Sequence, residues 1–148
     1  MSDTQDLIDL YSKRILALAA DIPHARLLDA PQGRATRRSP LCGSTVTADV
    51  VVEGDRVADF GFDVKACALG QASAAILGGV AKGLSREEIA AGREALRAML
   101  KDGAAPPEGT FAAFEVLQPA RDYRNRHASI MLAYDALLAA MDAVGAEG

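Results

Sequence analysis

The sequence predicts an α+β fold in which a small antiparallel sheet packs against helices. Three observations support this class. Apolar residues recur with a period of two on both sides of a turn near residue 54, which indicates a β-hairpin. The segments after residue 67 show helical spacing instead. Because the strands precede most of the helices and do not alternate with them, the order favours α+β.

The first segment predicts an amphipathic helix over residues 5–20, because its apolar residues are spaced for one face of a helix. They are Leu7, Leu10, Tyr11, Ile15 and Leu18. Residues 21–41 contain three prolines and a glycine. We therefore expect a loop-rich crossing there, with room for one short strand.

The hairpin follows. One face of its first strand is expected to carry Val46, Ala48, Val50 and Val52, and one face of the returning strand Ala58, Phe60, Phe62 and Val64. The turn between the strands is predicted at Glu53-Gly54-Asp55-Arg56.

Three helices are predicted after the hairpin. Small residues from Ala68 to Val80 indicate a tightly packed helix that ends near Gly78-Gly79. Ser85, followed three residues later by Glu88, forms a capping-box pattern that opens a helix to about Lys101. A Pro-rich loop over residues 103–109 and a short element over 110–118 lead to a C-terminal helix that begins near Ser129.

Length, composition and charge restrict the class of protein. Half of the 148 residues are apolar and the formal net charge is −4, so we expect one soluble domain over residues 1–148. No apolar run is long enough to span a membrane, and the N-terminus lacks the pattern of a signal peptide, which predicts a cytoplasmic protein. The arginine clusters are interpreted as solvated loops, not as a nucleic-acid surface. They are Arg34, Arg37 and Arg38, and Arg121, Arg124 and Arg126.

The two cysteines lie at the two ends of the predicted hairpin. A hairpin brings its ends together, so Cys42 and Cys67 are expected to face each other at the open end of the sheet, with sulfurs about 4 Å apart if they share one ion. Cys67 also precedes a helix, whose unpaired amides and dipole favour a thiolate. Two such thiols form half of a tetrahedral site for zinc or iron. The alternative is that both are small buried side chains.

The order of these motifs resembles a known family, the iron–sulfur cluster scaffolds of the IscU/SufU/NifU N-terminal type. That family has a Pro-x-Cys-Gly-Asp turn, a hairpin, a second Cys and a small-residue helix, and here the same order is found in PLCGSTVTADVVVEGDRVADFGFDVKACALGQASAAIL. The segment SREEIAAGREALRAMLKDG is similar to a helix that the SufU branch has and IscU lacks. The tail PARDYRNRHASIMLAYDAL resembles the family's ending. The resemblance extends over nearly the whole chain.

The resemblance implies four ligand positions for a metal ion or cluster, and two of them hold serine in this chain. Cys42 and Cys67 are kept, the Asp after the Cys-Gly turn falls on Ser44, and the third Cys falls on Ser129. Hydroxyls are neutral and poor ligands for zinc or iron, so binding of zinc or of a transient iron–sulfur cluster is expected to be weak or absent. His127 is expected to be an exposed loop residue, with an imidazole ligand as the alternative, and His24 offers no stronger case.

As a member of this family the chain would be a carrier and not an enzyme. It would receive sulfur from a cysteine desulfurase, with Cys42 as the candidate persulfide acceptor and Cys67 as a cluster ligand, and pass clusters to iron–sulfur acceptor proteins. A homodimer would supply four thiolates to a shared cluster. One alternative is a diverged paralogue without stable metal binding that acts as a protein-interaction module. A thiol–disulfide enzyme is disfavoured by the absence of a Cys-x-x-Cys pair. No nucleic acid or membrane partner is expected.

Overall fold

The computed structural model describes residues 12–40 and 43–144. Its elements follow in the order α2 (Lys13–Ala20), β1 (Gly33–Arg38), β2 (Thr45–Glu53), β3 (Arg56–Lys65), α3 (Ala68–Val80), α4 (Arg86–Lys101), the 3₁₀ segments η1 (Gly109–Asp122) and η2 (Arg124–Arg126), and α5 (His127–Ala143). The predicted α+β class is confirmed. The start of the helix predicted over residues 5–20 lies outside the described residues, and its remainder is α2.

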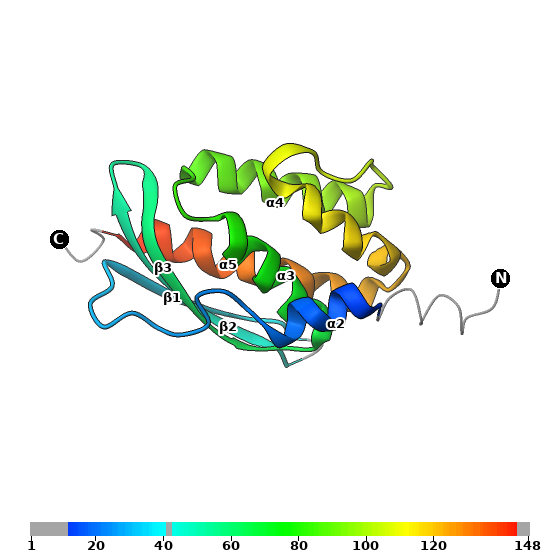
Figure 1. The fold of residues 1–148 in the computed structure, drawn as a ribbon, viewed down its shortest axis with the longest axis horizontal. Coiled ribbons are helices and arrows are strands. Elements are labelled where there is room, and N and C mark those ends of the chain that lie inside the picture. Colours follow the sequence, from blue (N-terminus) through cyan, green and yellow to red (C-terminus); the bar gives the residue numbers. More distant parts are fainter. Residues whose placement is uncertain (1–11, 41–42, 145–148) are drawn as a thin grey trace.

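The elements form three layers (Figure 1). The antiparallel sheet, in the order β1-β2-β3, forms one side. Helices α3 and α5 lie against it, and α5 contacts both β1 and β2. The third layer consists of α4 and η1, which pack on α5 and α3. The buried residues of α5 lie all around its axis, as expected for a helix between two layers.

The hairpin has the predicted strands with one irregularity. Val46, Ala48, Val50, Phe60 and Phe62 are buried in the core, as the alternation indicates. The pairing shifts between Val51 and Val52, so that Val52 lies opposite Val57. Because a shift of this kind changes which side chains face inward, Val57 is buried where we expected Ala58.

The loop-rich crossing covers the outer face of the sheet. Asp49 of β2 points to this face and is completely buried there. Its carboxylate accepts hydrogen bonds from the guanidinium of Arg34 on β1 (2.5 and 2.8 Å) and from the amide of Leu28 in the crossing (2.9 Å). Arg34 is exposed, as expected, but it is a strand residue that neutralises a buried charge and not a loop residue.

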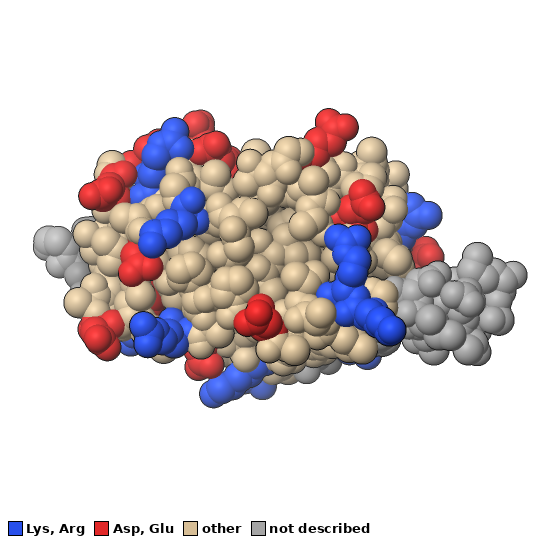
Figure 2. Space-filling view, viewed as in Figure 1, with Lys and Arg blue, Asp and Glu red and all other residues tan. Residues whose placement is uncertain are grey.

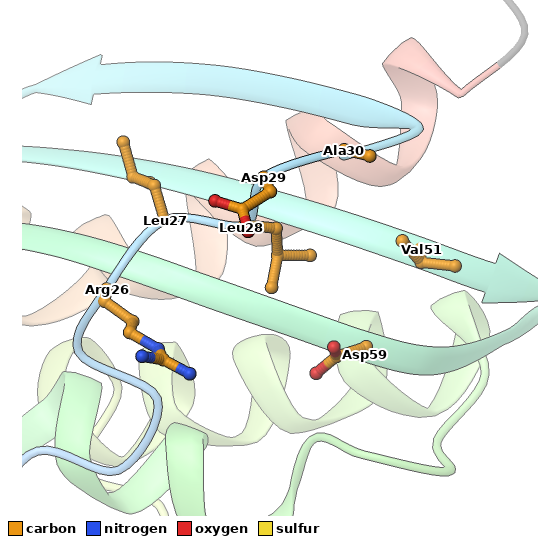
Figure 3. A pocket seen from close by; sticks show the side chains of 7 residues that line it. All are labelled: Arg26, Leu27, Leu28, Asp29, Ala30, Val51 and Asp59. Carbon is orange, nitrogen blue, oxygen red and sulfur yellow. The ribbon is translucent and has the colours of Figure 1, made fainter.

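An open cavity of about 390 Å³ lies between this crossing and the sheet. Figure 3 shows the side chains that line it. Arg26, Asp29 and Asp59 border it together with apolar side chains. The mixture of one cation and two carboxylates favours no single class of ligand. On the face shown in Figure 2, charges of both signs are mixed around the edge and the centre is largely uncharged.

The helices after the hairpin begin and end close to their predicted limits. Ser85 accepts a hydrogen bond from the amide of Glu88 and the Glu88 carboxylate accepts one from the amide of Ser85, which confirms the capping box of α4. Helix α3 continues through Gly78-Gly79 to Val80, and α5 begins two residues earlier than predicted, at His127. Among the described residues, no helix has the length and apolar character needed to cross a membrane.

Candidate metal and thiol site

Three predicted site residues come together at one end of the molecule. The pairing of Thr45 with Lys65 places the start of β2 beside the end of β3. Ser44 directly precedes β2, and Cys67 follows β3 as the N-cap of α3. Ser129 lies in the first turn of α5, which packs against both α3 and β2. Ser44, Cys67 and Ser129 thus come from three parts of the chain.

The three side chains form a hydrogen-bonded row with Ser129 in the middle. Ser129 Oγ lies 3.0 Å from Ser44 Oγ and 3.5 Å from Cys67 Sγ. Both serines are buried: 1% of Ser129 and 3% of Ser44 is exposed. The free thiol of Cys67 is partly accessible. A hydroxyl has one proton to donate, so Ser129 donates to at most one of these neighbours and accepts from at least one. Each buried hydroxyl therefore has a partner without any metal ion.

Cys42 lies outside the described residues, so the predicted approach of its sulfur to Cys67 remains a prediction. Its neighbours in the chain are described. Ser39 and Ser44 are joined by a backbone hydrogen bond of 2.8 Å, and the Gly43 amide donates to the Ser39 carbonyl at 2.9 Å. The described residues on either side of Cys42 thus lie at the same end of the sheet as Cys67.

A close helix contact, which sequence reasoning missed, positions Ser129 at the thiol. Gly70 of α3 packs so tightly on α5 that a Cβ atom at this position would lie 2.6 Å from Ser129 Oγ and 2.9 Å from the Ala66 Cβ. Only glycine permits this approach. The signal in the sequence is a glycine three residues after the cysteine, at the start of a run of small residues.

We predict that Gly70→Ala destabilises the protein by about 1–3 kcal/mol, because the added methyl group forces α3 away from Ser129. Gly79→Ala is the matched control in the same helix. Its Cβ would meet nothing within 4 Å, so we expect a gain of about 0.5–1 kcal/mol from helix propensity. Urea denaturation measures both changes. Equal effects of the two substitutions would contradict the close contact at Gly70.

The surroundings of Cys67 favour its thiolate. Burial by itself raises the pKa of this thiol, but the hydrogen bond from Ser129, the nearby amides of Gly70 and Leu69 and the charge of Arg126 outweigh it, and the net pKa is lowered. The amides act at short range without completing a capping hydrogen bond to the sulfur. The prediction from the helix N-terminus is therefore right in direction, and Ser129 and Arg126 add to it.

The spacing of the site suits a metal ion, but its chemistry does not. Ligand atoms around a tetrahedral zinc ion with bonds of ~2.0–2.3 Å lie about 3.3–3.8 Å apart, close to the two distances observed here. Neutral hydroxyls, however, are weak ligands for zinc or iron, and these two are already bonded to each other. Among the described residues, no three His, Cys, Asp or Glu side chains come together in a metal-binding group.

His127 differs from its prediction, whereas His24 lies in the loop where it was expected. His127 is buried, with 4% exposed, and its Nε2 lies 3.0 Å from the Ala120 carbonyl oxygen. It was expected to be an exposed loop residue. The short element predicted over residues 110–118 is the 3₁₀ segment η1, which continues to Asp122 and places the Ala120 carbonyl against the ring. His24 is exposed in the crossing, where its ring stacks on Phe60 with centroids 4.4 Å apart.

Comparison with known proteins places this fold in a family. The family model described as the NifU-like N terminal domain matches residues 10–143. The crystal structure of the N-terminal part of a nitrogen-fixing NifU-like protein from Brucella abortus is 39% identical, with a TM-score of 0.91 over 97% of this chain and 99% of that one.

A second structure is similar in fold. It comes from thermophilic Fervidobacterium islandicum AW-1 and is described as an iron–sulfur cluster assembly scaffold for the SUF system. Its identity is 19%, its TM-score 0.82, and the match covers 90% of this chain and 98% of that one. No curated protein matches the chain. Because the family model covers nearly the whole sequence and the Brucella structure agrees with it throughout, this protein belongs to the NifU-like N-terminal domain family.

Proposed function

We propose that this protein is a scaffold and sulfur acceptor in iron–sulfur cluster assembly, a carrier and not an enzyme. Membership in the NifU-like N-terminal domain family is the observation that carries the proposal. The position of Cys67 supports it, because the thiol lies at the end of the molecule where Ser44 and Ser129, the two other described ligand positions, meet. Its partners would be a cysteine desulfurase, which supplies sulfur, and iron–sulfur acceptor proteins, which receive clusters, in the cytoplasm.

Sulfur transfer needs a thiolate that reaches a persulfide on the desulfurase. We assign this role to Cys42, which directly precedes Gly43 in the sequence. Its thiolate attacks the outer sulfur of the desulfurase persulfide, a new S–S bond forms on Cys42, and the desulfurase cysteine leaves as a thiolate. The reaction moves one sulfur atom without a change in the number of electrons. No further oxidant or reductant is required.

Cluster binding at this site is limited by the number of anionic ligands. A [2Fe–2S] cluster takes four protein ligands, and each chain offers the two thiolates of Cys42 and Cys67. A cluster shared by two chains would have four thiolates. The hydroxyls of Ser44 and Ser129 would then stay hydrogen-bonded to each other beside the cluster. We therefore propose that the cluster is a transient cargo held by a homodimer.

Anaerobic reconstitution with ferrous iron and sulfide tests this proposal. We expect visible absorbance of an iron–sulfur cluster, about one iron per chain and a shift to the mass of a dimer. Cys67→Ser should abolish all three signals. Ser73→Ala is the control and should keep all three signals. It removes a hydroxyl of α3 that donates a hydrogen bond to the Ile130 carbonyl. A wild-type protein that takes up no iron under conditions that load a four-ligand relative would contradict the scaffold function.

One observation favours a second candidate. The serine pair satisfies its own hydrogen bonds, as expected of a site that no longer holds a metal ion. A diverged paralogue that keeps the fold as a protein-interaction module would show this arrangement. It predicts no iron uptake in reconstitution but retained binding to a desulfurase, which size-exclusion chromatography of the mixed proteins measures.

A further inference from the structure

A second cavity with a chemistry of its own lies on the side of η2. It has a volume of about 190 Å³ and is lined by Lys101, Arg124 and His127. Lys101 is the last residue of α4, Arg124 belongs to η2, and His127 is the first residue of α5. Three separate elements thus contribute to it. The roles proposed for Cys42, Cys67 and the two serines use none of these side chains.

The cavity is positively charged. Within the described part of the chain, neither Lys101 nor Arg124 has a carboxylate partner, whereas Arg34, Arg56, Arg86, Arg93 and Arg97 all have one. The acid next to Lys101 in the sequence, Asp102, is engaged by Arg97 at 3.0 Å. In addition, no side chain caps the N-terminus of α5, so its partial positive charge is not neutralised by a cap. These features together favour an anion.

The buried histidine adds a hydrogen-bond acceptor. A carbonyl oxygen only accepts, so the contact with Ala120 requires the proton of a neutral ring to be on Nε2. The residue is buried, with 4% exposed, and Nδ1 then has a free lone pair with no partner among the described residues. A ligand that matches this cavity therefore has negative oxygens for Lys101 and Arg124 and also one O–H group for His127.

We propose that this cavity binds the hydrogen phosphate ion. At neutral pH inorganic phosphate keeps one proton, and its other oxygens share the negative charge. Sulfate has no proton to donate, and phosphate monoesters, with a second pKa near 6, lose theirs above that pH. At about 190 Å³ the cavity is large enough to hold a tetrahedral ion. This inference goes beyond the proposed function and does not depend on it.

Isothermal titration calorimetry of the full chain tests the assignment, with inorganic phosphate, sulfate and phenyl phosphate at pH 7.5 and equal ionic strength. We expect phosphate to bind at least about tenfold more tightly than the other two, as a charge-assisted hydrogen bond requires. Lys101→Gln and Arg124→Gln should each weaken phosphate binding by about tenfold. Both residues are exposed, so these variants are expected to fold. Lys82→Gln is the control, since it removes an exposed cation between α3 and α4.

The outcomes separate the parts of the proposal. Equal affinity for sulfate and phosphate would overturn the role of His127 as an acceptor. Equal weakening by Lys82→Gln would show general charge attraction only, and would overturn the site. If the heat of binding measured with phosphate were no larger than that measured with chloride, the site would also be overturned. Because iron uptake and sulfur transfer are measured separately, failure here leaves the scaffold function untouched.

Discussion

Incubated with a cysteine desulfurase and cysteine, the protein is expected to gain one sulfur atom on Cys42, and Cys42→Ser is expected to abolish this gain. The expected effect is a complete loss, because a hydroxyl at this position does not attack a persulfide. Mass spectrometry of the intact chain and of its peptides measures the added sulfur and its location. The persulfide should form before any iron is added, since the transfer needs only the two sulfur centres.

Two further variants distinguish the roles of the site residues. Ser129→Ala removes the hydrogen bonds to Cys67 and Ser44 but keeps the Cys42 thiol, so sulfur uptake should remain largely intact. Cys67→Ser should likewise keep the persulfide while it abolishes cluster formation. If neither cysteine takes up sulfur while a four-ligand relative does so under the same conditions, the acceptor function is wrong. The chain would then be better described as an interaction module.

Local signals predicted most of the fold. The hairpin strands follow from a period of two, and α4 follows from Ser85 and Glu88, whose capping box involves residues only three apart. Such interactions are complete within one element, so the sequence of that element specifies them. The small-residue run that forms α3 also indicated close helix packing, although it did not say which neighbour would lie against Gly70.

The errors of prediction come from contacts between elements. Arg34 was expected in a solvated loop, but it binds Asp49, which is buried because the crossing from residue 22 to residue 32 covers the outer face of the sheet. His127 is buried because η1 places the Ala120 carbonyl over it. Neither contact has a periodic signal. Likewise, a register shift of one residue buries Val57 in the core in place of Ala58, which was the predicted residue.

The candidate site was only partly predictable. The pairing of hairpin ends follows from antiparallel geometry, which places Cys67 beside the start of β2. Ser129 is far along the chain, and only the resemblance to the scaffold family brought it into the site. The row from Ser44 through Ser129 to Cys67 depends on α5 crossing both the sheet and α3, which no local pattern expresses.

The row formed by Ser44, Ser129 and Cys67 also predicts that metal binding is recovered by substitution of the two serines. We expect the isolated protein to hold less than one zinc ion per chain and to lose it readily to a chelator. The double substitution Ser44→Asp and Ser129→Cys should restore tight binding, with an increase in affinity of at least about a thousandfold. Structural zinc sites gain roughly 10–16 kcal/mol from four good ligands, so two added anions account for several orders of magnitude.

The geometry supports this recovery. Ser129 Oγ already lies 3.0 Å from Ser44 Oγ and 3.5 Å from Cys67 Sγ, near the spacing of tetrahedral ligands. Competition with a chromophoric chelator measures the affinity, and thermal denaturation gives a second readout. A carboxylate placed at the buried position of Ser44 is costly without a cation, so EDTA should lower the Tm of the double variant but not that of the natural protein. The pair Ser44→Asn and Ser129→Ala, which adds no anion at the same positions, is the control and should bind no more zinc than the natural protein. If the double variant bound zinc no better than this control, the divergence of the site would extend beyond its two serines to the backbone that holds them.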